Sequence, residues 1–243
     1  MRPTLLLIAL LLSLSARIPI ARAAPRPVDV ALVLVSDVSL SITESEYALE
    51  KQGYATAIAS PEVVSAIRHG AIGAIALSYV EFAGPDQVAT VVAWQLIHDA
   101  ASARHFAATL LAAPRSAMGR TAVGSGIAAA TQDLAESGFA ATRRIIDVCG
   151  DGNSNTGVPL AVARAAALKA GITINGLAII HANPPPWLVP HVAPPGGIVA
   201  YYHDNIIGGP GSFVAQVNTD QDFTIAMTHK LILEIASRRA PRL

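Results

Sequence analysis

The sequence predicts an α/β protein built on an open, mainly parallel, doubly wound sheet with one antiparallel edge strand. Apolar runs of strand length alternate along the chain with segments of helical spacing, which is the pattern of repeated βαβ units. The first run, residues 28–35, is almost continuously apolar, as expected for a central parallel strand covered on both faces. Gly84-Pro85-Asp86 separates two β-rich runs, and so short a turn joins antiparallel strands.

Capping and turn residues set the bounds of the other elements. Thr43 and Glu46 form a Thr-x-x-Glu capping box that begins a helix, which ends near Pro61. Pro159 in a first helical turn and Gly171 just past a last turn bracket another helix. The first helix is expected to bury Tyr47, the stem of Lys51, Tyr54, Ala55 and Ile58. Further strands are expected at 71–82, 88–96, 143–149, 172–180 and 213–217, and further helices after Asp99, from Thr121 to about Glu136, at 159–169 and at 220–237.

The first 23 residues have the features of a secretory signal. The apolar stretch at 5–14 is too short to span a bilayer with ease, and Ala21-Arg22-Ala23 fits the small-x-small rule for cleavage. An uncleaved anchor is the alternative, which is disfavoured because basic residues and a proline follow the apolar stretch closely. We therefore predict a secreted or periplasmic protein that is cleaved near Ala23. A single domain is expected at 24–243, with a Pro/Gly-rich surface excursion at 182–212.

The composition argues against nucleic acid as a partner. The chain is 52% hydrophobic and 14% charged, with 17 basic and 17 acidic side chains. Cleavage after residue 23 would remove three arginines and no acid, which leaves a formal charge of −3 and no basic stripe for phosphate backbones. No later stretch is apolar and long enough to cross a membrane. Cys149 is the only cysteine, so an internal disulfide is impossible, and a buried strand thiol is expected.

Polar side chains fall at matching points of the predicted sheet. Asp37, Ser39 and Ser41 alternate after the first strand, Thr121 lies just ahead of a helix, and Asp151 follows a strand. Ligands of doubly wound sheets bind outside the carboxyl ends of the strands, so these side chains are expected to meet. Two carboxylates and three hydroxyls suit a hard divalent cation, Mg²⁺ first, with Mn²⁺ or Ca²⁺ as alternatives. The competing interpretation is a degenerate site whose oxygens only cap loops.

The order and context of these residues resemble a known site. Asp37-x-Ser39-x-Ser41, then Thr121, then Asp151-Gly152 are similar to the metal-ion-dependent adhesion site of von Willebrand factor A-type domains. The resemblance covers about 29–238 and implies a Rossmann-like sheet with helices on both faces. It implies that Ser39, Ser41 and Thr121 bind the ion directly and that Asp37 and Asp151 act mainly through bridging waters. The stretch YYHDNIIGGPGSFV also resembles a bacterial secreted branch catalogued as domain of unknown function 1194.

The chain departs from that family's pattern at three positions. Val38 and Leu40 stand where the family often has small residues, and Gly150 precedes Asp151 where a hydroxyl residue is common. These departures bear on the shape of the loops and on the affinity for the ion. They do not change which residues are expected to be ligands.

Histidine and aromatic residues give weaker signals. The seven histidines do not pair at spacings for joint zinc ligation, so surface or core roles are expected for them. Ser125 lies between two glycines, but the Gly-x-Ser-x-Gly elbow of hydrolases is absent. Trp187, Tyr201 and Tyr202 lie in the excursion, and two roles stay open for them. They are either anchors for a partner or pins that hold the loop to its own domain.

The leading hypothesis is a metal-dependent protein-binding domain rather than an enzyme. Neutral hydroxyls around the ion leave it net positive charge and an open position for the Asp or Glu of a protein partner. The rival is a Mg²⁺-dependent hydrolase or phosphoesterase at the same site, in which Asp37 or Asp151 would have to serve as base or nucleophile. A third hypothesis is a purely structural module in an envelope assembly.

Overall fold

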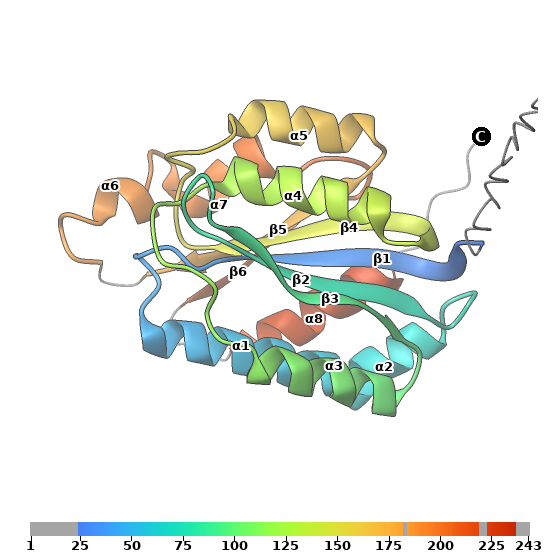
Figure 1. The fold of residues 1–243 in the computed structure, drawn as a ribbon. Coiled ribbons are helices and arrows are strands. Elements are labelled where there is room, and N and C mark those ends of the chain that lie inside the picture. The colour runs from blue at the N-terminus through green and yellow to red at the C-terminus, as the bar shows by residue number, and fades with distance from the viewer. Residues whose placement is uncertain (1–23, 182–183, 219–222, 237–243) are drawn as a thin grey trace, which may run out of the picture.

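A six-stranded sheet forms the centre of the protein in a computed structural model that describes residues 24–181, 184–218 and 223–236 (Figure 1). The strand order is β3-β2-β1-β4-β5-β6. β3 is antiparallel to β2, and the other neighbouring strands are parallel. This confirms the predicted sheet and its antiparallel edge. The strands are β1 (Arg26–Asp37), β2 (Ile75–Phe82), β3 (Val88–Ile97), β4 (Phe139–Gly150), β5 (Thr173–Ile180) and β6 (Val214–Asn218).

Helices cover both faces of the sheet, as predicted (Figure 1). α1, α2, α3 and α8 lie on one face, and α4, α5 and α7 lie on the other. No helix among the described residues combines the length and the apolar composition needed to cross a bilayer. The helices are α1 (Glu44–Ala59), α2 (Pro61–Arg68), α3 (Ala100–Ala112), α4 (Val123–Glu136), α5 (Leu160–Lys169), α6 (Val189–Val192), α7 (Gly197–Tyr201), the π-helix η1 (Tyr202–Ile206) and α8 (Phe223–Ala236).

β1 is one of the two central strands of the sheet, and both of its faces are apolar. Leu32 and Leu34 belong to the core on the α1 and α8 side, whereas Val33 and Val35 belong to the core on the α4 and α5 side. Burial of each such side chain contributes roughly 1.5–3 kcal/mol relative to exposure. The strand is therefore fixed in register by packing on two sides, which also fixes the position of Asp37 at its end.

α1 begins with the predicted capping box. Thr43 Oγ1 accepts a hydrogen bond from Glu46 N at 3.2 Å, and Glu46 Oε2 accepts one from Thr43 N at 2.8 Å. Pro61 follows the end of α1, but it also occupies the first turn of α2, a helix that the sequence did not predict. Ser60 Oγ caps α2 by accepting from Val63 N at 3.2 Å. Proline suits a first helical turn because its missing N–H has no partner there.

The starts of two strands, β2 and β4, lie four residues from the predicted positions, whereas the other strand bounds agree within two residues. β2 begins at Ile75 rather than at 71, because Gly73 adopts a positive φ of 77° and Asp29 Oδ2 accepts from Gly73 N at 2.8 Å. β4 begins at Phe139 rather than at 143, because its first residues pair with the start of β1, with Arg26 opposite Phe139. The predicted signal at 1–23 and the predicted ends of the last helix, 220–222 and 237, lie outside the described residues.

Two of the three aromatic residues of the 182–212 segment contact the rest of the domain. Tyr202 is fully buried, and the Tyr201 hydroxyl accepts a hydrogen bond from Ser154 N at 3.0 Å. These two tyrosines hold the segment against its own domain. Trp187 is 76% exposed and makes no such contribution to the core.

Candidate metal site

Two strand ends lie side by side at the edge of the sheet where the site was predicted. β1 ends at Asp37, β4 ends at Gly150, and the parallel register pairs Ser36 with Cys149. Asp37 and Gly150 are therefore neighbours, and Asp151 follows directly. Parallel pairing of the two strands thus brings together two carboxylates that lie more than 100 residues apart in the sequence.

Four of the five predicted ligands form one chain of hydrogen bonds. Ser39 N donates to Asp37 Oδ1 at 2.8 Å, which folds the loop back over the end of β1. The hydroxyls of Ser39 and Ser41 lie 2.9 Å apart, and Ser41 Oγ donates to Asp151 Oδ1 at 2.8 Å. The loop therefore brings the hydroxyls of Ser39 and Ser41 to the Asp151 carboxylate, with Asp37 bonded to the main chain of the same loop.

Thr121 reaches the same edge of the sheet from a third loop. Leu40 N donates to Gly119 O at 2.9 Å, which ties this loop to the loop after β1. Thr121 N donates to Asn155 Oδ1 at 3.1 Å, which ties it to the loop after β4. The Thr121 hydroxyl, however, forms a hydrogen bond of 3.1 Å with His191 Nε2 rather than with one of the other four predicted ligands.

The two carboxylates are buried close to each other. Asp37 is 1% exposed and Asp151 is fully buried. Burial, followed by repulsion from Asp151, raises the pKa of Asp37 well above its ordinary value. Asp37 Oδ2 has no hydrogen-bond partner among the described residues. This part of the protein therefore favours a bound positive charge or a proton.

The presence of glycine at position 150, one of the departures from the family pattern, has a steric explanation. A Cβ at this position would lie 2.9 Å from Asp37 Cβ and 3.0 Å from the Tyr202 hydroxyl. The absence of a side chain lets Asp37 and Tyr202 approach the end of β4. The Tyr202 hydroxyl, like Asp37 Oδ2, has no hydrogen-bond partner within the described part of the chain.

The oxygen cluster fits a small divalent cation. No three His, Cys, Asp or Glu side chains of the described residues are grouped so as to hold a metal ion, so an ion here would need the hydroxyls. The serine and aspartate oxygens lie 2.8–2.9 Å apart. Neighbouring ligands of an octahedral ion with bonds of about 2.1 Å are separated by about 3 Å. These oxygens could therefore exchange their mutual hydrogen bonds for an ion with little movement.

Two histidines that the sequence analysis did not assign to the site also lie there. His181 Nε2 is 2.8 Å from Asp151 Oδ2, and His181 Nδ1 is 3.6 Å from Glu46 Oε1. The hydrogen bond to Asp151 raises the pKa of His181, whereas burial lowers the pKa of His191. Neither residue could be assigned to the site from a local pattern, because His181 and His191 lie 30 and 70 positions from their partners Asp151 and Thr121.

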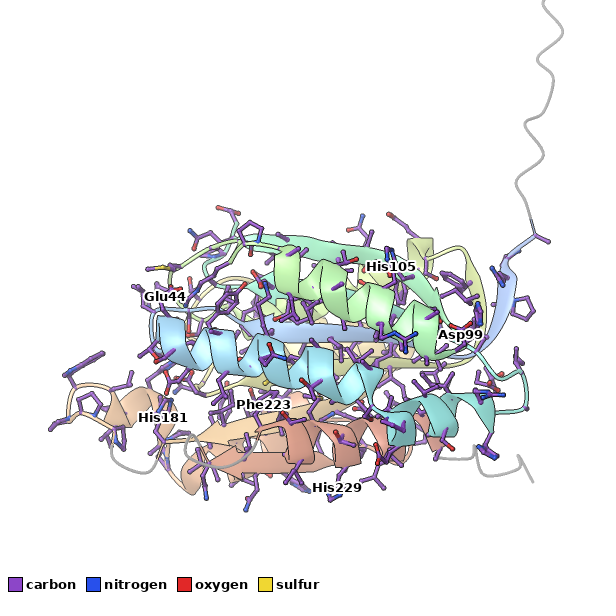
Figure 2. All side chains as sticks on the ribbon, turned by 90° about the horizontal axis from the view of Figure 1, so that it is seen from below. Glu44, Asp99, His105, His181, Phe223 and His229 are labelled. Carbon is purple, nitrogen blue, oxygen red and sulfur yellow. The ribbon has the colours of Figure 1, made fainter. Side chains whose placement is uncertain are left out.

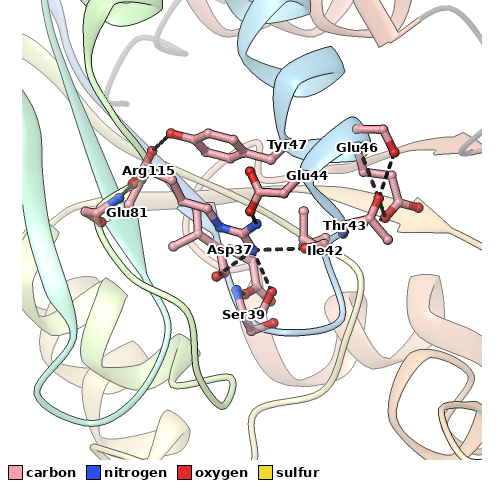
Figure 3. Close-up of polar contacts among 12 residues, drawn as sticks. Asp37, Ser39, Ile42, Thr43, Glu44, Glu46, Tyr47, Glu81 and Arg115 are labelled. Carbon is pink, nitrogen blue, oxygen red and sulfur yellow. Dashed lines mark hydrogen bonds and ion pairs between the residues drawn. The ribbon is translucent and has the colours of Figure 1, made fainter.

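Arg115 holds the loop after β1 through hydrogen bonds to its main chain (Figure 3). Its Nη2 donates to the carbonyl oxygens of Val38, Ser39 and Ile42 at 2.9–3.0 Å. Its Nη1 donates to Glu44 Oε1 at 2.6 Å. The Arg115 side chain is only 9% exposed. Planar guanidinium groups suit such multiple donation, so Arg115 fixes the loop shape that the hydroxyl ligands need.

Comparison with solved structures defines the class of fold. Proximal thread matrix protein 1 from the mussel byssus has a TM-score of 0.58 at 16% identity, over 86% of this chain and 46% of that chain. One structure of that protein is described as having a zinc-occupied MIDAS motif. A von Willebrand factor type A structure from Catenulispora acidiphila has a TM-score of 0.51 at 17% identity, over 86% of this chain and 42% of that chain. The fold is therefore that of a von Willebrand factor A-type domain.

The family follows from the sequence itself. The family described as "Protein of unknown function (DUF1194)" matches residues 27–239, and the chain belongs to it. The pilus adhesin SpaC from Lactobacillus rhamnosus GG has a similar fold, with a TM-score of 0.55 at 14% identity over 86% of this chain and 31% of that chain. The chain spans less than half the length of these three structural relatives. A search of curated proteins gives no match.

Proposed function

We propose that the protein is a secreted or periplasmic binding domain of the adhesion type, which binds an acidic group of a protein partner through a divalent cation. The proposed ligands of the ion are Asp37, Ser39, Ser41, Thr121 and Asp151. The observation that carries the proposal is the buried Asp37 Oδ2, which has no partner among the described residues and lies next to a second buried carboxylate. A buried charge without a partner is strongly unfavourable, and a cation would offset that cost.

The residue types explain how such an ion would recognise a partner. Ser39, Ser41 and Thr121 offer neutral oxygens, so they do not cancel the charge of an ion that they hold. Asp37 and Asp151 place negative charge on the protein side of it. When bound, the ion supplies positive charge and a vertex that an acidic side chain can occupy. Leu40, at 66% exposure, places the tip of the loop in solvent, where a partner can reach it.

The structural relatives support a role in binding. One of them is described as a pilus adhesin and another as a thread matrix protein, and a structure of the latter carries zinc at the corresponding kind of motif. At 14–16% identity these relatives establish the fold alone. Binding of a metal ion, binding of a protein and location outside the cytoplasm therefore belong to the proposal.

Two competing functions make different predictions for the same site. A hydrolase that uses the ion should turn over phosphoesters with added Mg²⁺ and should lose turnover in Asp37→Ala. A structural module should keep its envelope partners when a chelator removes divalent ions. The proposed binding domain should give no turnover and should lose its partners in the chelator.

A calorimetric titration tests the ion site directly. We would titrate Mg²⁺, Mn²⁺, Ca²⁺ and Zn²⁺ into the purified protein and into the variants Asp37→Ala and Asp151→Ala. The exposed acid Asp204 provides a matched control, Asp204→Ala. We expect the wild type and the control to bind at least one ion, with binding reduced at least tenfold in the other two variants. Absence of binding to the wild type would end the proposal.

A further inference from the structure

His191 is held against the candidate metal site by both its main chain and its side chain. Its Nε2 lies 3.1 Å from Thr121 Oγ1, and its Nδ1 lies 2.6 Å from Asn153 Oδ1. Its carbonyl oxygen accepts a hydrogen bond from Asn153 N at 3.1 Å. Because two neighbouring loops position it, this imidazole has a defined orientation at the Thr121 side of the site.

The hydrogen bond at Nδ1 fixes which ring nitrogen can bind a metal. Asn153 Oδ1 is an amide oxygen and only accepts, so His191 Nδ1 carries the proton. In the neutral ring the lone pair is then on Nε2, which accepts from the Thr121 hydroxyl. A histidine that binds a metal commonly has this arrangement, with one nitrogen donating to a neighbouring oxygen and the other facing the ion.

Gly152 allows the imidazole to come this close. A Cβ at position 152 would lie 2.0 Å from His191 Nε2, so any side chain there would displace the ring. Gly152 directly follows Asp151, which places the imidazole beside the loop that carries one of the proposed ligands. The glycine therefore has a role beyond the shape of the loop, because it leaves room for a nitrogen donor.

His181 does not offer the same chemistry. Its Nε2 contacts Asp151 Oδ2, and a carboxylate oxygen only accepts, so this nitrogen carries a proton. Its Nδ1 faces Glu46 Oε1 at 3.6 Å rather than the hydroxyl ligands. Of these two histidines, His191 is the one whose nitrogen lone pair is directed at a proposed ligand.

We infer that His191 Nε2 is a nitrogen ligand of the ion, and that the site takes a Zn²⁺-type ion in preference to Mg²⁺. This inference rests on the proposed function, because it concerns the ion held at Asp37, Ser39, Ser41, Thr121 and Asp151. Imidazole nitrogen suits Zn²⁺, Co²⁺ and Ni²⁺, whereas Mg²⁺ prefers oxygen ligands alone. The buried Asp37 Oδ2, without a partner among the described residues, is the independent sign that a cation belongs here.

Metal titration of His191→Ala tests the inference. We would measure the affinities for Zn²⁺, Co²⁺ and Mg²⁺ by calorimetry and record the visible absorption of the Co²⁺ form. His203, an exposed histidine of the same segment, provides the control His203→Ala. We expect Zn²⁺ affinity to fall at least tenfold in His191→Ala, Mg²⁺ affinity to change less than about threefold, and the Co²⁺ spectrum to shift. The control should match the wild type. Unchanged Zn²⁺ affinity in folded His191→Ala would overturn the inference.

A second variant keeps the test valid if His191→Ala does not fold. Asn153→Ala retains the imidazole and removes the acceptor that fixes its ring, so a smaller loss of Zn²⁺ affinity is expected, again with little change for Mg²⁺. The two proposals fail in different ways. A wild type that binds no divalent ion overturns the proposed function. Ion binding that depends on Asp37 and is indifferent to His191 and Asn153 overturns this inference alone.

Discussion

Replacement of Arg115 by alanine should destabilise the protein by about 3 kcal/mol. The variant removes the donor that serves the carbonyl oxygens of Val38, Ser39 and Ile42. The Ser39 carbonyl keeps a hydrogen bond from Ile42 N at 3.1 Å, so the loss falls mainly on Val38 and Ile42. A buried acceptor that loses its partner destabilises a protein by about 1–3 kcal/mol. For the two carbonyl oxygens together we expect about 3 kcal/mol, because water can hydrate them in part once the guanidinium is removed.

The ion pair with Glu44 should contribute little to that loss. The Glu44 side chain is 74% exposed, and an exposed ion pair is worth roughly 0–1 kcal/mol. Glu44→Ala is therefore a matched control that removes the same ion pair and leaves the three carbonyl contacts intact. The difference between the two variants isolates the support that Arg115 gives to the loop.

Thermal and urea unfolding of Arg115→Ala, Glu44→Ala and the wild type supply the measurement. For a chain of this size, about 3 kcal/mol corresponds to a fall in Tm of roughly 6–12 °C. Glu44→Ala should stay within about 1 kcal/mol of the wild type. If Arg115→Ala is no less stable than Glu44→Ala, the guanidinium does not hold the loop and the reasoning is wrong.

Three further predictions concern buried polar groups. Burial raises the pKa of Glu50 to about 7. Between about pH 4.5 and pH 7 the folded state therefore binds a proton that the unfolded state has released. The free energy of unfolding should decline as pH rises through this range. Glu50→Gln should make this decline less steep in chelator-treated protein, and an unchanged slope would contradict the assignment. Lys230 forms ion pairs with the buried Asp147, at 2.6 Å, and with the buried Glu234. Lys230→Met should therefore lower the free energy of unfolding by about 3–5 kcal/mol, measured by urea unfolding. A loss under about 1 kcal/mol would refute this prediction. Cys149 is fully buried, and burial raises the pKa of its thiol, so a disulfide reagent should modify it only after unfolding. Rapid modification of the folded protein would show that the thiol is accessible.

Local sequence signals were sufficient for most of the fold. The Thr43 to Glu46 capping box is present, and Lys51 is buried on the predicted face of α1, with its ammonium donating to Ala113 O. Figure 2 shows the face of the molecule that α1 covers. Glu44 is labelled near the start of α1, and Phe223 of α8 is labelled between α1 and α8. Such signals act over one or two turns, so they place single elements well. They failed at Pro61, where one proline both follows one helix and begins the next.

The site required contacts that no local pattern contains. Alternate spacing and strand ends were enough to predict that Asp37, Ser39, Ser41 and Asp151 would meet. Arg115 and His191 could not be predicted in this way. Arg115 contacts carbonyl oxygens that lie 73 to 77 positions earlier, and His191 reaches Thr121 across 70 positions. Both contacts depend on how loops from separate strands fold toward one edge of the sheet.

A crystal structure with a bound ion, located by anomalous scattering after growth in Zn²⁺ or Mn²⁺, tests the central claim most directly. The account predicts one ion bonded to the hydroxyl oxygens of Ser39, Ser41 and Thr121 at about 2.1 Å, with Asp37 and Asp151 beside it. It would be contradicted if these hydroxyls kept their present hydrogen bonds while the ion lay elsewhere, or if no ion bound at all.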